Sequence, residues 1–448
     1  MIPVVTPEEM RAIDAAADED VEVFIHRAGT AVARAALDLL GGTYGRTVRV
    51  IAGPGNNGED GRVAARLLAD RGVKVQVIDA RNCPPVLPPC DLVIDAAYGT
   101  GFHGEWRAPA VGGAKVLAVD IPSGLDGSTG LASGPVLTAD VTVTFAAAKP
   151  GLFLGDGPRV SGTVRVVDIG LDVSSARMHQ VRSADVADWL PRRAVDDHKW
   201  SHAVRVVAGS PGMTGAAALV SAAAQRAGAG MVHLSSPGID GESPVEVVTR
   251  RVPAFDWAPA VLSDLHRFHA LVIGPGLGRE DYTVPSITRV VRESVVPAIV
   301  DGDGLFALAW NADGAPTMLR RREVPTLLTP HDGEYSLLTG SHVGADRPLA
   351  ARRLAADTGA VVLLKGPTTV IAEPSGQVYL VTNGDERLAT AGTGDVLGGI
   401  IAGLVAGGLD LPRAAAAGAW IHAAAASFAP KRGMVASDLI THLPEVFS

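Results

Sequence analysis

The sequence has little cysteine and few aromatic residues. Two of its 448 residues are cysteines, Cys83 and Cys90, and aromatic residues make up 4%. The cysteines lie in CPPVLPPC, which lacks the paired spacing of a zinc site, so we expect reduced thiols in a cytoplasmic protein. With few aromatic rings, the cores must be built from valine, leucine and alanine, which is typical of an α/β protein rich in small residues.

Excess positive charge and long apolar runs are also missing. The formal net charge is −9, and no basic stripe is visible that could neutralise nucleic-acid phosphates. The longest apolar run, residues 396–409, is too short to cross a bilayer, and the N-terminus lacks the basic and apolar regions of a secretory signal. We therefore expect small-molecule substrates, with no nucleic-acid and no membrane partner.

The chain is longer than a single hydrophobic core supports, which predicts two or three domains. Between residues 46 and 145, apolar runs that end in Gly, Ser or Asp follow one another, and a helical pattern at 61–72 separates the first two, as in parallel βαβ units. After the charged segment 182–202 a second series begins, and its last apolar run, 360–372, is expected to form a strand. These patterns predict two α/β domains divided near residue 178, with ligands bound at the strand ends.

The stretch TAGTGDVLGG (390–399) is a glycine-rich turn that leads into an apolar helix. Glycines let backbone N–H groups approach a phosphate, and a helix N-terminus adds partial positive charge, which predicts an anion site at Gly392 to Gly394. Asp395 comes next, in the place for a general base that deprotonates a hydroxyl. The alternative is an ordinary aspartate that interacts with the helix dipole.

Further motifs accompany this turn. LLKGPTT (363–369) supplies Lys365, TPHDGE (329–334) supplies His331 and Glu334, and IGPGLG (273–278) adds a tight turn. With DDHK and AGSPGMTGAA before them, these motifs resemble the ribokinase-like ADP/ATP-dependent NAD(P)H-hydrate dehydratases over about residues 185–448. The resemblance implies that Asp395 is catalytic and that Mg²⁺ acts with ADP or ATP. The nucleotide-binding residues that it implies are Lys365, Gly366, Pro367, Thr368, Thr369 and Gly394, and the substrate-binding residues are Ala216, Gly276 and His331.

A second glycine-rich stretch, GPGNNGEDG (53–61), lies in the first half of the chain. Together with VIDAAYGTGFHGE (93–105), AVDIPSGLDG (118–127) and FAAAKPGLFLGDGP (145–158), it resembles the NAD(P)H-hydrate epimerase domain over about residues 4–172. The resemblance implies a catalytic Asp120 and a potassium site at Asn57, Asp95 and Ser123, whose oxygen atoms suit a hard cation. The substrate-binding residues that it implies are Asn56, Asn57, Gly58, Glu59, Asp60, Gly99, Thr100, Gly101, Phe102, His103, Gly104 and Glu105.

Both halves together resemble the bifunctional NAD(P)H-hydrate repair enzymes. The resemblance implies a Rossmann-like three-layer α/β/α domain at residues 1–178, followed by a ribokinase-like α/β/α domain at 179–448. It implies a substrate hydrated at C6 of the nicotinamide ring, whose R and S forms the first domain interconverts. The second domain would dehydrate the S form at the expense of ADP, giving AMP and phosphate. Family members are often oligomers, so we expect a homo-oligomer.

Two other functions stay open at this point. The second half has the pattern of a small-molecule kinase as well, and the first half fits a non-catalytic nucleotide-binding or scaffold domain. Three departures from the family motifs bear on this choice. Glu59 replaces a glycine of NNGGDG, Trp200 replaces the glycine of HKG, and Phe306 stands where the family has asparagine. We expect Glu59 to weaken the first site, and Trp200 and Phe306 to lie at the edge of the second.

Overall fold

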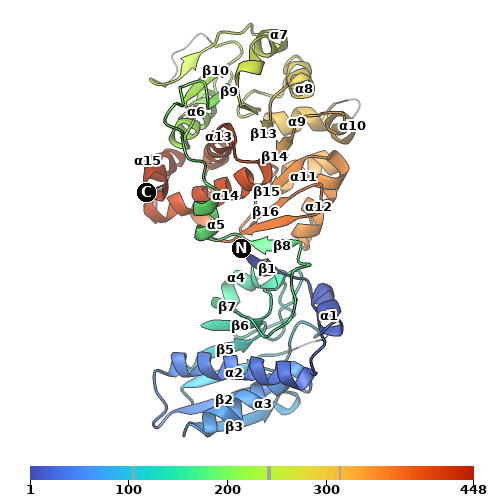
Figure 1. Cartoon of the computed structure of the whole chain (residues 1–448), viewed down its shortest axis with the longest axis vertical. Helices are drawn as coiled ribbons and strands as arrows, with labels where there is room; N and C mark the ends of the chain where they lie inside the picture. Colours follow the sequence, from blue (N-terminus) through green and yellow to red (C-terminus); the bar gives the residue numbers. More distant parts are fainter. Residues whose placement is uncertain (103, 105, 240–243, 312–313, 448) are drawn as a thin grey trace. The chain divides into compact units, whose positions relative to one another are not determined.

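The computed structural model describes residues 1–102, 104, 106–239, 244–311 and 314–447. The chain forms two compact units, one spanning Ile2–His179 and the other Gln180–Ser448 together with Met1 (Figure 1). Strand β8 (Met178–Gln180) spans the division between them. Each unit is described by itself below. In the part of the chain that the structure describes, no helix is long and apolar enough to cross a membrane.

The N-terminal unit is built on a parallel sheet with the strand order β3-β2-β4-β5-β6-β7. Buried side chains alternate between its two faces, as a strand period of two requires. Val50 and Ile94 pack toward helices α2 and α3, whereas Ile51 and Val93 pack toward loop residues such as Trp106 and Leu137. The strands are β1 (Ile2–Val4), β2 (Thr47–Ala52), β3 (Lys74–Asp79), β4 (Leu92–Ala96), β5 (Lys115–Val119), β6 (Val141–Phe145) and β7 (Thr163–Val167).

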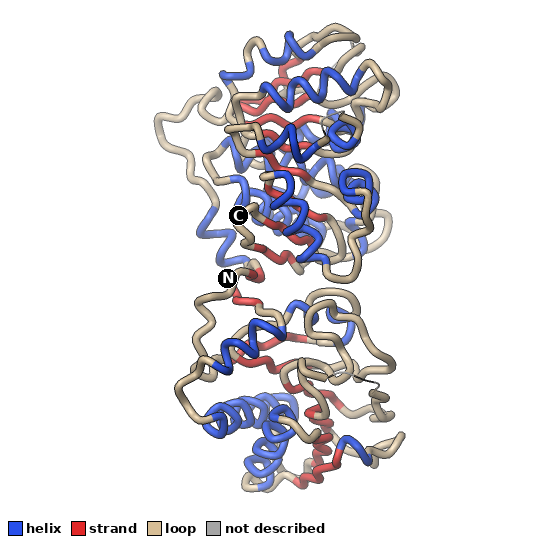
Figure 2. Tube along the Cα trace, turned by 90° about the vertical axis from the view of Figure 1, so that its right-hand side faces the viewer, coloured by secondary structure: helices blue, strands red, loops and turns tan. Residues whose placement is uncertain are grey.

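Helices α2 and α3 pack against each other on one face of this sheet (Figures 1 and 2). Thr6 and Glu9 form a reciprocal capping box at the start of α1. The helices are α1 (Pro7–Ala15), α2 (Val21–Leu40), α3 (Asn56–Ala69) and α4 (Gly157–Val160), with 3₁₀ turns η1 (Ala80–Asn82) and η2 (Pro150–Leu152).

Helix α3 begins earlier than the apolar pattern predicts. The pattern indicated a helix from residue 61, but Asn56 already has helical structure, with Gly55 as its N-cap. The carbonyl of Gly55 accepts hydrogen bonds from the backbone N–H groups of Gly58 and Glu59. The polar residues of the glycine-rich stretch therefore form the first turn of a helix, which the search for apolar periodicity missed because its side chains are not apolar.

The C-terminal unit is a second α/β unit with the strand order β17-β16-β15-β14-β13-β12-β9-β10-β11. The pairs from β14 to β11 are parallel, as are β14 and β15. The strands are β9 (Ala203–Val207), β10 (Met231–Ser235), β11 (Val248–Thr249), β12 (Ala270–Ile273), β13 (Ala298–Val300), β14 (Thr326–Leu328), β15 (Val361–Leu364), β16 (Thr369–Ala372) and β17 (Val378–Val381).

The expectation of one strand over residues 360–372 was wrong. Strands β15 and β16 form an antiparallel hairpin in which Leu364 pairs with Val370. The four residues between the strands, 365–368, include a Gly-Pro pair that breaks the extended run. The hairpin places Lys365 directly after a buried parallel strand, at the edge of the sheet where the polar residues gather.

Two groups of helices cover this sheet (Figure 1). Helices α6, α13, α14 and α15 share a large alanine- and valine-rich core with the sheet, as the low aromatic content predicts. The first group is α6 (Thr214–Arg226), α13 (Thr393–Ala406), α14 (Leu411–Phe428) and α15 (Ala436–Phe447). The short helix α5 (Ser183–Trp189) contacts α14. The second is α7 (Ala258–Leu262), α8 (Thr283–Glu293), α9 (Asp303–Ala309), α10 (Ala315–Arg320), α11 (Asp332–Thr339) and α12 (Arg347–Thr358), with 3₁₀ turns η3 (Leu265–Arg267) and η4 (Glu386–Leu388) elsewhere.

Candidate functional sites

The N-terminal unit contains a cavity of about 720 Å³ at the carboxyl ends of its strands. The first turn of α3, the segment after β4 and the end of β5 contribute its polar lining, and α1 and α2 contribute further residues. The predicted site residues that line it are Asn56, Asn57, Asp60, Gly99, Thr100, Gly101, Phe102 and Asp120. His103 and Glu105 lie outside the described residues, and Gly58, Glu59 and Gly104 are not part of the lining.

Two glycines allow the first turn of α3 to pack against neighbouring backbone. A Cβ on Gly58 would lie 2.0 Å from the carbonyl oxygen of Gly53, and a Cβ on Gly53 would lie 1.8 Å from that of Ala97. Neither position tolerates a side chain without moving the backbone. The glycines at 53 and 58 therefore let the turn pack closely against the strand ends. This packing brings Asn57 and Asp60 to the cavity.

Asp120 is held by a buried lysine, Lys149, that was not among the residues predicted from the sequence. Lys149 Nζ lies 2.5 Å from Asp120 Oδ1, and its side chain is only 2% exposed. The same Nζ donates to Thr144 Oγ1 and to the carbonyl oxygens of Phe145 and Ala147. Asp120 has a φ of +65°, a conformation unusual for a residue other than glycine. The signal for Lys149 was present in FAAAKPG, where a charged residue follows an apolar strand.

Asp60 lines the same cavity but lacks the ion pair and hydrogen bonds that hold Asp120. It is 6% exposed, and its carboxyl group has no hydrogen bond or ion pair in the described part of the chain. Burial raises the pKa of Asp60 to about 8, and the charges of Asp120 and Glu59 add to this rise, while Lys149 opposes it. Asp60 is thus a protonated acid at neutral pH, close enough to Asp120 to respond to its charge.

Asp95 and Ser123 form a buried pair beside the cavity. Both are fully buried, and Ser123 donates to Asp95 from its hydroxyl at 2.6 Å and from its backbone N–H at 3.0 Å. Burial raises the pKa of Asp95, although the hydrogen bonds from Ser123 oppose the rise. The side-chain amide of Asn57 lies near Gly99, and both its oxygen and its nitrogen are buried without a hydrogen-bond partner among the described residues. These groups supply oxygen atoms and an unsatisfied amide, which fit a monovalent cation.

Glu59 does not enter the cavity. Its side chain is 47% exposed and pairs with Arg62 at 2.8 Å, one turn further along α3. The side chain therefore does not obstruct the cavity, and its effect on this site is electrostatic, through the pKa of Asp60.

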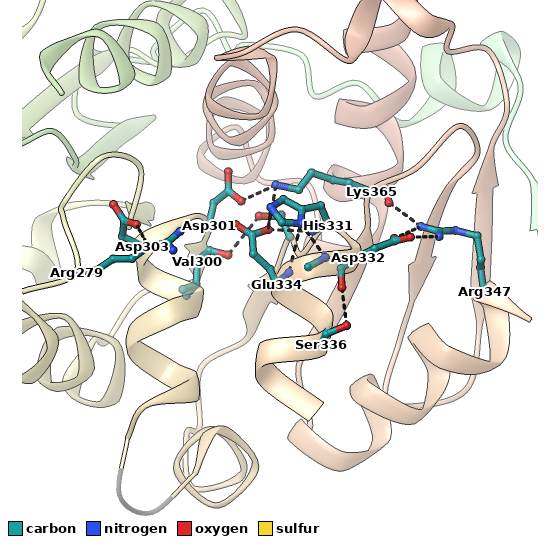
Figure 3. A network of polar contacts seen from close by, with 12 residues as sticks. Arg279, Val300, Asp301, Asp303, His331, Asp332, Glu334, Ser336, Arg347 and Lys365 are labelled. Carbon is teal, nitrogen blue, oxygen red and sulfur yellow. Dashed lines mark hydrogen bonds and ion pairs between the residues drawn. The ribbon is translucent and has the colours of Figure 1, made fainter. Parts of the chain in front are cut away.

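In the C-terminal unit, Lys365 joins two carboxylates at the carboxyl ends of the strands (Figure 3). Its Nζ lies 2.9 Å from Asp301 Oδ1 and 3.6 Å from Glu334 Oε2. Burial lowers the pKa of Lys365, but the two carboxylates outweigh that effect, so its pKa is raised. Asp301 is absent from the predicted site, although the sequence signal existed, since it directly follows the buried run of β13 in PAIVDGDG.

Asp395 lies in the first turn of α13, next to this cluster. A Cβ placed on the preceding Gly394 would lie 3.7 Å from Asp301 Oδ2 and 3.7 Å from Lys365 Nζ. Burial raises the pKa of Asp395 to about 6, and the charges of Asp301 and Asp303 add to the rise, while Lys365 opposes it. Gly392 has a left-handed backbone and forms the N-cap of α13, whose first N–H groups have no side-chain cap. The structure thus combines a helix N-terminus, a lysine and a carboxylate poised near neutral pH.

His331 caps helix α11, as Figure 3 shows. Its Nδ1 accepts hydrogen bonds from the backbone N–H groups of Gly333 and Glu334, which leaves Nε2 to carry the proton of the neutral ring. Glu334 Oε2 accepts in return from the backbone N–H of His331. The same Oε2 atom lies 3.6 Å from Lys365 Nζ. The capping box therefore orients His331 toward the Lys365 cluster.

The other predicted residues of this unit fall into two places. Ala216 and Gly276 adjoin each other, since a Cβ on Gly276 would lie 3.1 Å from that of Ala216. Arg347, at the start of α12, donates to the carbonyl oxygen of Lys365 in the hairpin turn at 2.6 Å and pairs with Asp332 at 2.9 Å. The remaining predicted nucleotide residues, Gly366, Pro367, Thr368 and Thr369, follow Lys365 in this turn and at the start of β16.

The two departures from the family pattern in this unit lie in different places. Trp200 precedes β9 and packs edge-on against His233 and Phe268, with Arg267 over its ring. This places it at the amino ends of the strands, opposite the Lys365 cluster, so the expectation that it lies at the edge of the site was wrong. Phe306 lies closer, in α9, where Arg279 covers its ring and also pairs with Asp303.

The fold and the two sites define an α/β enzyme of two units, the second of them ribokinase-like. Family models match both halves: "NAD(P)H-hydrate dehydratase" over residues 204–447, and "YjeF-related protein N-terminus" over residues 21–86 and 78–151. The chain belongs to the family of bifunctional NAD(P)H-hydrate repair enzymes. It is 38% identical to the enzyme of that name from Moorella thermoacetica, over 90% of this chain and 87% of the relative. It is also 38% identical to the Mycobacterium leprae enzyme, over 90% and 89%.

Solved structures agree with the fold of the second unit. An ADP/ATP-dependent NAD(P)H-hydrate dehydratase from Bacillus subtilis, co-crystallised with ATP and Mg²⁺, matches with a TM-score of 0.52 and 31% identity. The match covers 59% of this chain and 96% of that chain. A ribokinase-like protein from Enterococcus faecalis matches with a TM-score of 0.52, 20% identity, and coverage of 60% and 96%, which supports the fold alone.

Proposed function

We propose that the protein repairs hydrated NADH and NADPH with two active sites, one in each unit. The unit at residues 1–178 epimerises the R and S forms of the hydrate, and the unit at 179–448 dehydrates the S form at the expense of ADP, with AMP and phosphate as products. The observation that carries this proposal is the placement of Asp395, with its raised pKa, at the N-terminus of α13 beside Lys365 and Asp301. The family to which the chain belongs supports the choice of substrate.

The second site has to remove the hydroxyl group of the hydrated ring, which is a poor leaving group. Hydroxide leaves a ring carbon slowly, whereas a phosphate ester leaves readily, so transfer of a terminal phosphoryl group prepares the elimination. Asp395 takes the proton of the ring hydroxyl as its oxygen attacks the phosphorus. The N–H groups at Gly394 stabilise the transferring phosphoryl group, and Lys365 neutralises its charge. Ala216, Gly276 and His331 bind the substrate.

The nucleotide is held by the hairpin turn and by α13. Lys365, Gly366, Pro367, Thr368, Thr369 and Gly394 are its binding residues. Arg347 supports the turn by its hydrogen bond to the carbonyl of Lys365. Mg²⁺ prefers carboxylate oxygen together with phosphate oxygen, and Asp301, next to Gly394, has a second oxygen not used by Lys365. When bound, Mg²⁺ would neutralise charge on the phosphates.

In the first site, the cavity residues bind the hydrated ring and Asp120 acts on it. The substrate-binding residues that line this cavity are Asn56, Asn57, Asp60, Gly99, Thr100, Gly101 and Phe102. Asn57, Asp95 and Ser123 would hold potassium, because the unsatisfied amide of Asn57 and the buried oxygens of Asp95 and Ser123 match the needs of a hard cation. Bound potassium supplies positive charge that offsets the buried Asp95 carboxylate.

The assay is the conversion of an R/S mixture of NADH hydrate with ADP or ATP and Mg²⁺, followed by the absorbance of reduced nicotinamide. Full conversion with release of phosphate supports both activities, and conversion that stops after the S form leaves only the dehydratase. A stable phosphorylated product instead would favour a small-molecule kinase fused to a scaffold domain. We also propose a cytoplasmic homo-oligomer, to which exposed apolar residues on α2, Val21 and Val23, lend support. Light scattering on the purified protein tests the oligomer.

A further inference from the structure

The geometry points to an acid–base pair in the N-terminal cavity, with Asp60 as proton donor, Asp120 as proton acceptor and Lys149 as the positioning residue of Asp120. This inference rests on the proposed epimerase function and deepens it. Both carboxyl groups line the same cavity of about 720 Å³, and they come from different elements, the first turn of α3 and the end of β5. Their surroundings differ in a way that gives them opposite protonation states.

Asp120 is surrounded by donors. Lys149 Nζ lies 2.5 Å from Oδ1, and Thr144 donates to the same oxygen at 2.9 Å. The Nζ atom has four oxygen neighbours, namely Asp120, Thr144, Phe145 and Ala147, and only the charged ammonium has enough protons to serve three of them. A buried ammonium requires a charged partner, so this arrangement favours the Asp120 carboxylate.

Asp60 has the reverse environment. It is 94% buried, because its exposed fraction is 6%, and no donor in the described residues reaches its carboxyl group. The charges of Asp120, Glu59 and Lys149 act on it, and Asp14, Glu19 and Tyr98 line the same cavity. Four of these six groups are carboxyl groups, which disfavours a further negative charge. Burial raises the pKa of Asp60 to about 8, so the group holds a proton at neutral pH.

A carboxylic acid and an ion-paired carboxylate in one cavity can serve inversion at C6, the first as proton donor and the second as proton acceptor. As the C6–O bond breaks, Asp60 gives its proton to the departing hydroxyl, which leaves as water, and the N1 lone pair forms a C6=N1 double bond. Water then adds to the opposite face: the new C6–O bond forms, the C6=N1 electron pair returns to nitrogen, and Asp120 takes the proton. The two carboxyl groups have then exchanged protonation states, and transfer through cavity water, or turnover in the reverse direction, restores them.

Lys149 acts through Asp120 and does not touch the substrate in this scheme. Asp120 has a left-handed backbone with a φ of +65°, and its N–H is held by the carbonyl of Val143. The ion pair with Lys149 fixes the side chain in this strained position. Loss of the lysine is therefore expected to lower kcat of the epimerase with little change in KM, since substrate contacts remain.

The test uses the full chain, an R/S mixture of NADH hydrate and ADP with Mg²⁺. The S form is consumed in a fast phase, and the R form in a slow phase limited by epimerisation. We expect Asp60→Asn and Asp120→Asn to slow the second phase by about 100-fold or more, while the fast phase is unchanged. Asp70→Asn, an exposed aspartate at the end of the same helix, is the matched control and keeps both phases within about twofold.

Two measurements on the unmodified protein do not depend on the folding of a variant. The rate of the slow phase is expected to fall as pH rises through about 8, where Asp60 loses its proton. Protonation of Asp395 at low pH lowers the rate of the fast phase only. In H₂¹⁸O, each inversion incorporates one labelled oxygen beyond the exchange seen without protein. Two results overturn the acid–base pair while leaving the epimerase function intact. One is retention of the original oxygen, and the other is a slow-phase rate of Asp60→Asn within about threefold of the wild-type rate. A protein that never consumes the R form fails the proposed function instead.

Discussion

Lys365 and Asp301 form an ion pair with Nζ and Oδ1 2.9 Å apart, at the carboxyl ends of two parallel strands. We expect Asp301→Asn to lower the dehydratase rate by about 100-fold, because the variant loses a charge that positions Lys365 and serves the phosphates. Steady-state kinetics with saturating ADP checks this. Asp357→Asn, an exposed change near the end of α12, is the control. A loss of rate in both variants would point to a general effect on folding.

The pKa of Asp395 predicts the pH dependence of dehydration. A general base must be ionised, so the rate is expected to fall as pH drops through about 6, the value to which burial and Asp301 raise this carboxyl group. Asp395→Asn is expected to lose at least about 100-fold and to flatten the profile. The measurement is the initial rate of the fast phase between pH 5 and 9, fitted to a single ionisation. A profile that stays level down to pH 5 would contradict the role.

The same carboxylate predicts a change in stability. Its folded pKa of about 6 lies above the ordinary value of 3.8, so ionisation opposes folding at every pH where the group is charged. The cost begins above pH 3.8, grows up to about pH 6 and is constant above it. Asp395→Asn should therefore raise the melting temperature at pH 8 and leave it nearly unchanged at pH 3.5. Calorimetry at the two pH values decides the point, and an equal shift at both would refute it.

Replacement of Glu59 by glycine tests the departure from the NNGGDG motif. Because Glu59 is half exposed, pairs with Arg62 and does not line the cavity, we expect the epimerase rate at pH 7 to stay within about threefold. Glycine inside the first turns of α3 costs about 1 kcal/mol of stability, and removal of the negative charge lowers the pKa of Asp60. The alkaline limb of the slow phase should move to lower pH. A large gain in rate would show that Glu59 obstructs the site.

Ser123→Ala tests the potassium site. The hydroxyl of Ser123 donates to the buried Asp95 carboxylate at 2.6 Å and accepts from the N–H of Tyr98, so its loss is expected to cost about 1–3 kcal/mol of folding stability. The slow phase of the wild type should depend on potassium concentration, and this dependence should weaken in the variant. The exposed Ser174→Ala serves as the control. A slow phase indifferent to potassium in the wild type argues against the cation.

Apolar runs revealed the strands more readily than the polar connections between them. The buried strands β12 and β13 consist of apolar residues only, so their positions follow from composition. The start of α3 does not, because Asn56 and Asn57 lie in a turn that the N–H groups of Gly58 and Glu59 close onto the carbonyl of Gly55, and its polar side chains give no apolar periodicity. Nor does the hairpin of β15 and β16, since both strands are apolar and only a short turn separates them.

The two sites were predictable to different depths. Motif resemblance predicted site roles for Asp395, Lys365 and Asp120, whereas the charged groups that contact or influence them follow other strands. Asp301 and Lys149 follow buried runs, and only the folded chain brings them to their partners. Trp200 shows the converse. Its place in the HKG motif suggested a position at the edge of the site, whereas it lies just before β9, at the far end of the sheet.

The left-handed backbone at Asp120 also limits how this chain can change over time. Asparagine and aspartate tolerate that conformation better than other residues with side chains, so few replacements leave the turn unstrained. Asparagine keeps the shape of the side chain and removes its charge. A single substitution would then silence the proposed first catalytic centre without unfolding it, and the chain would persist with the activity of its second unit alone.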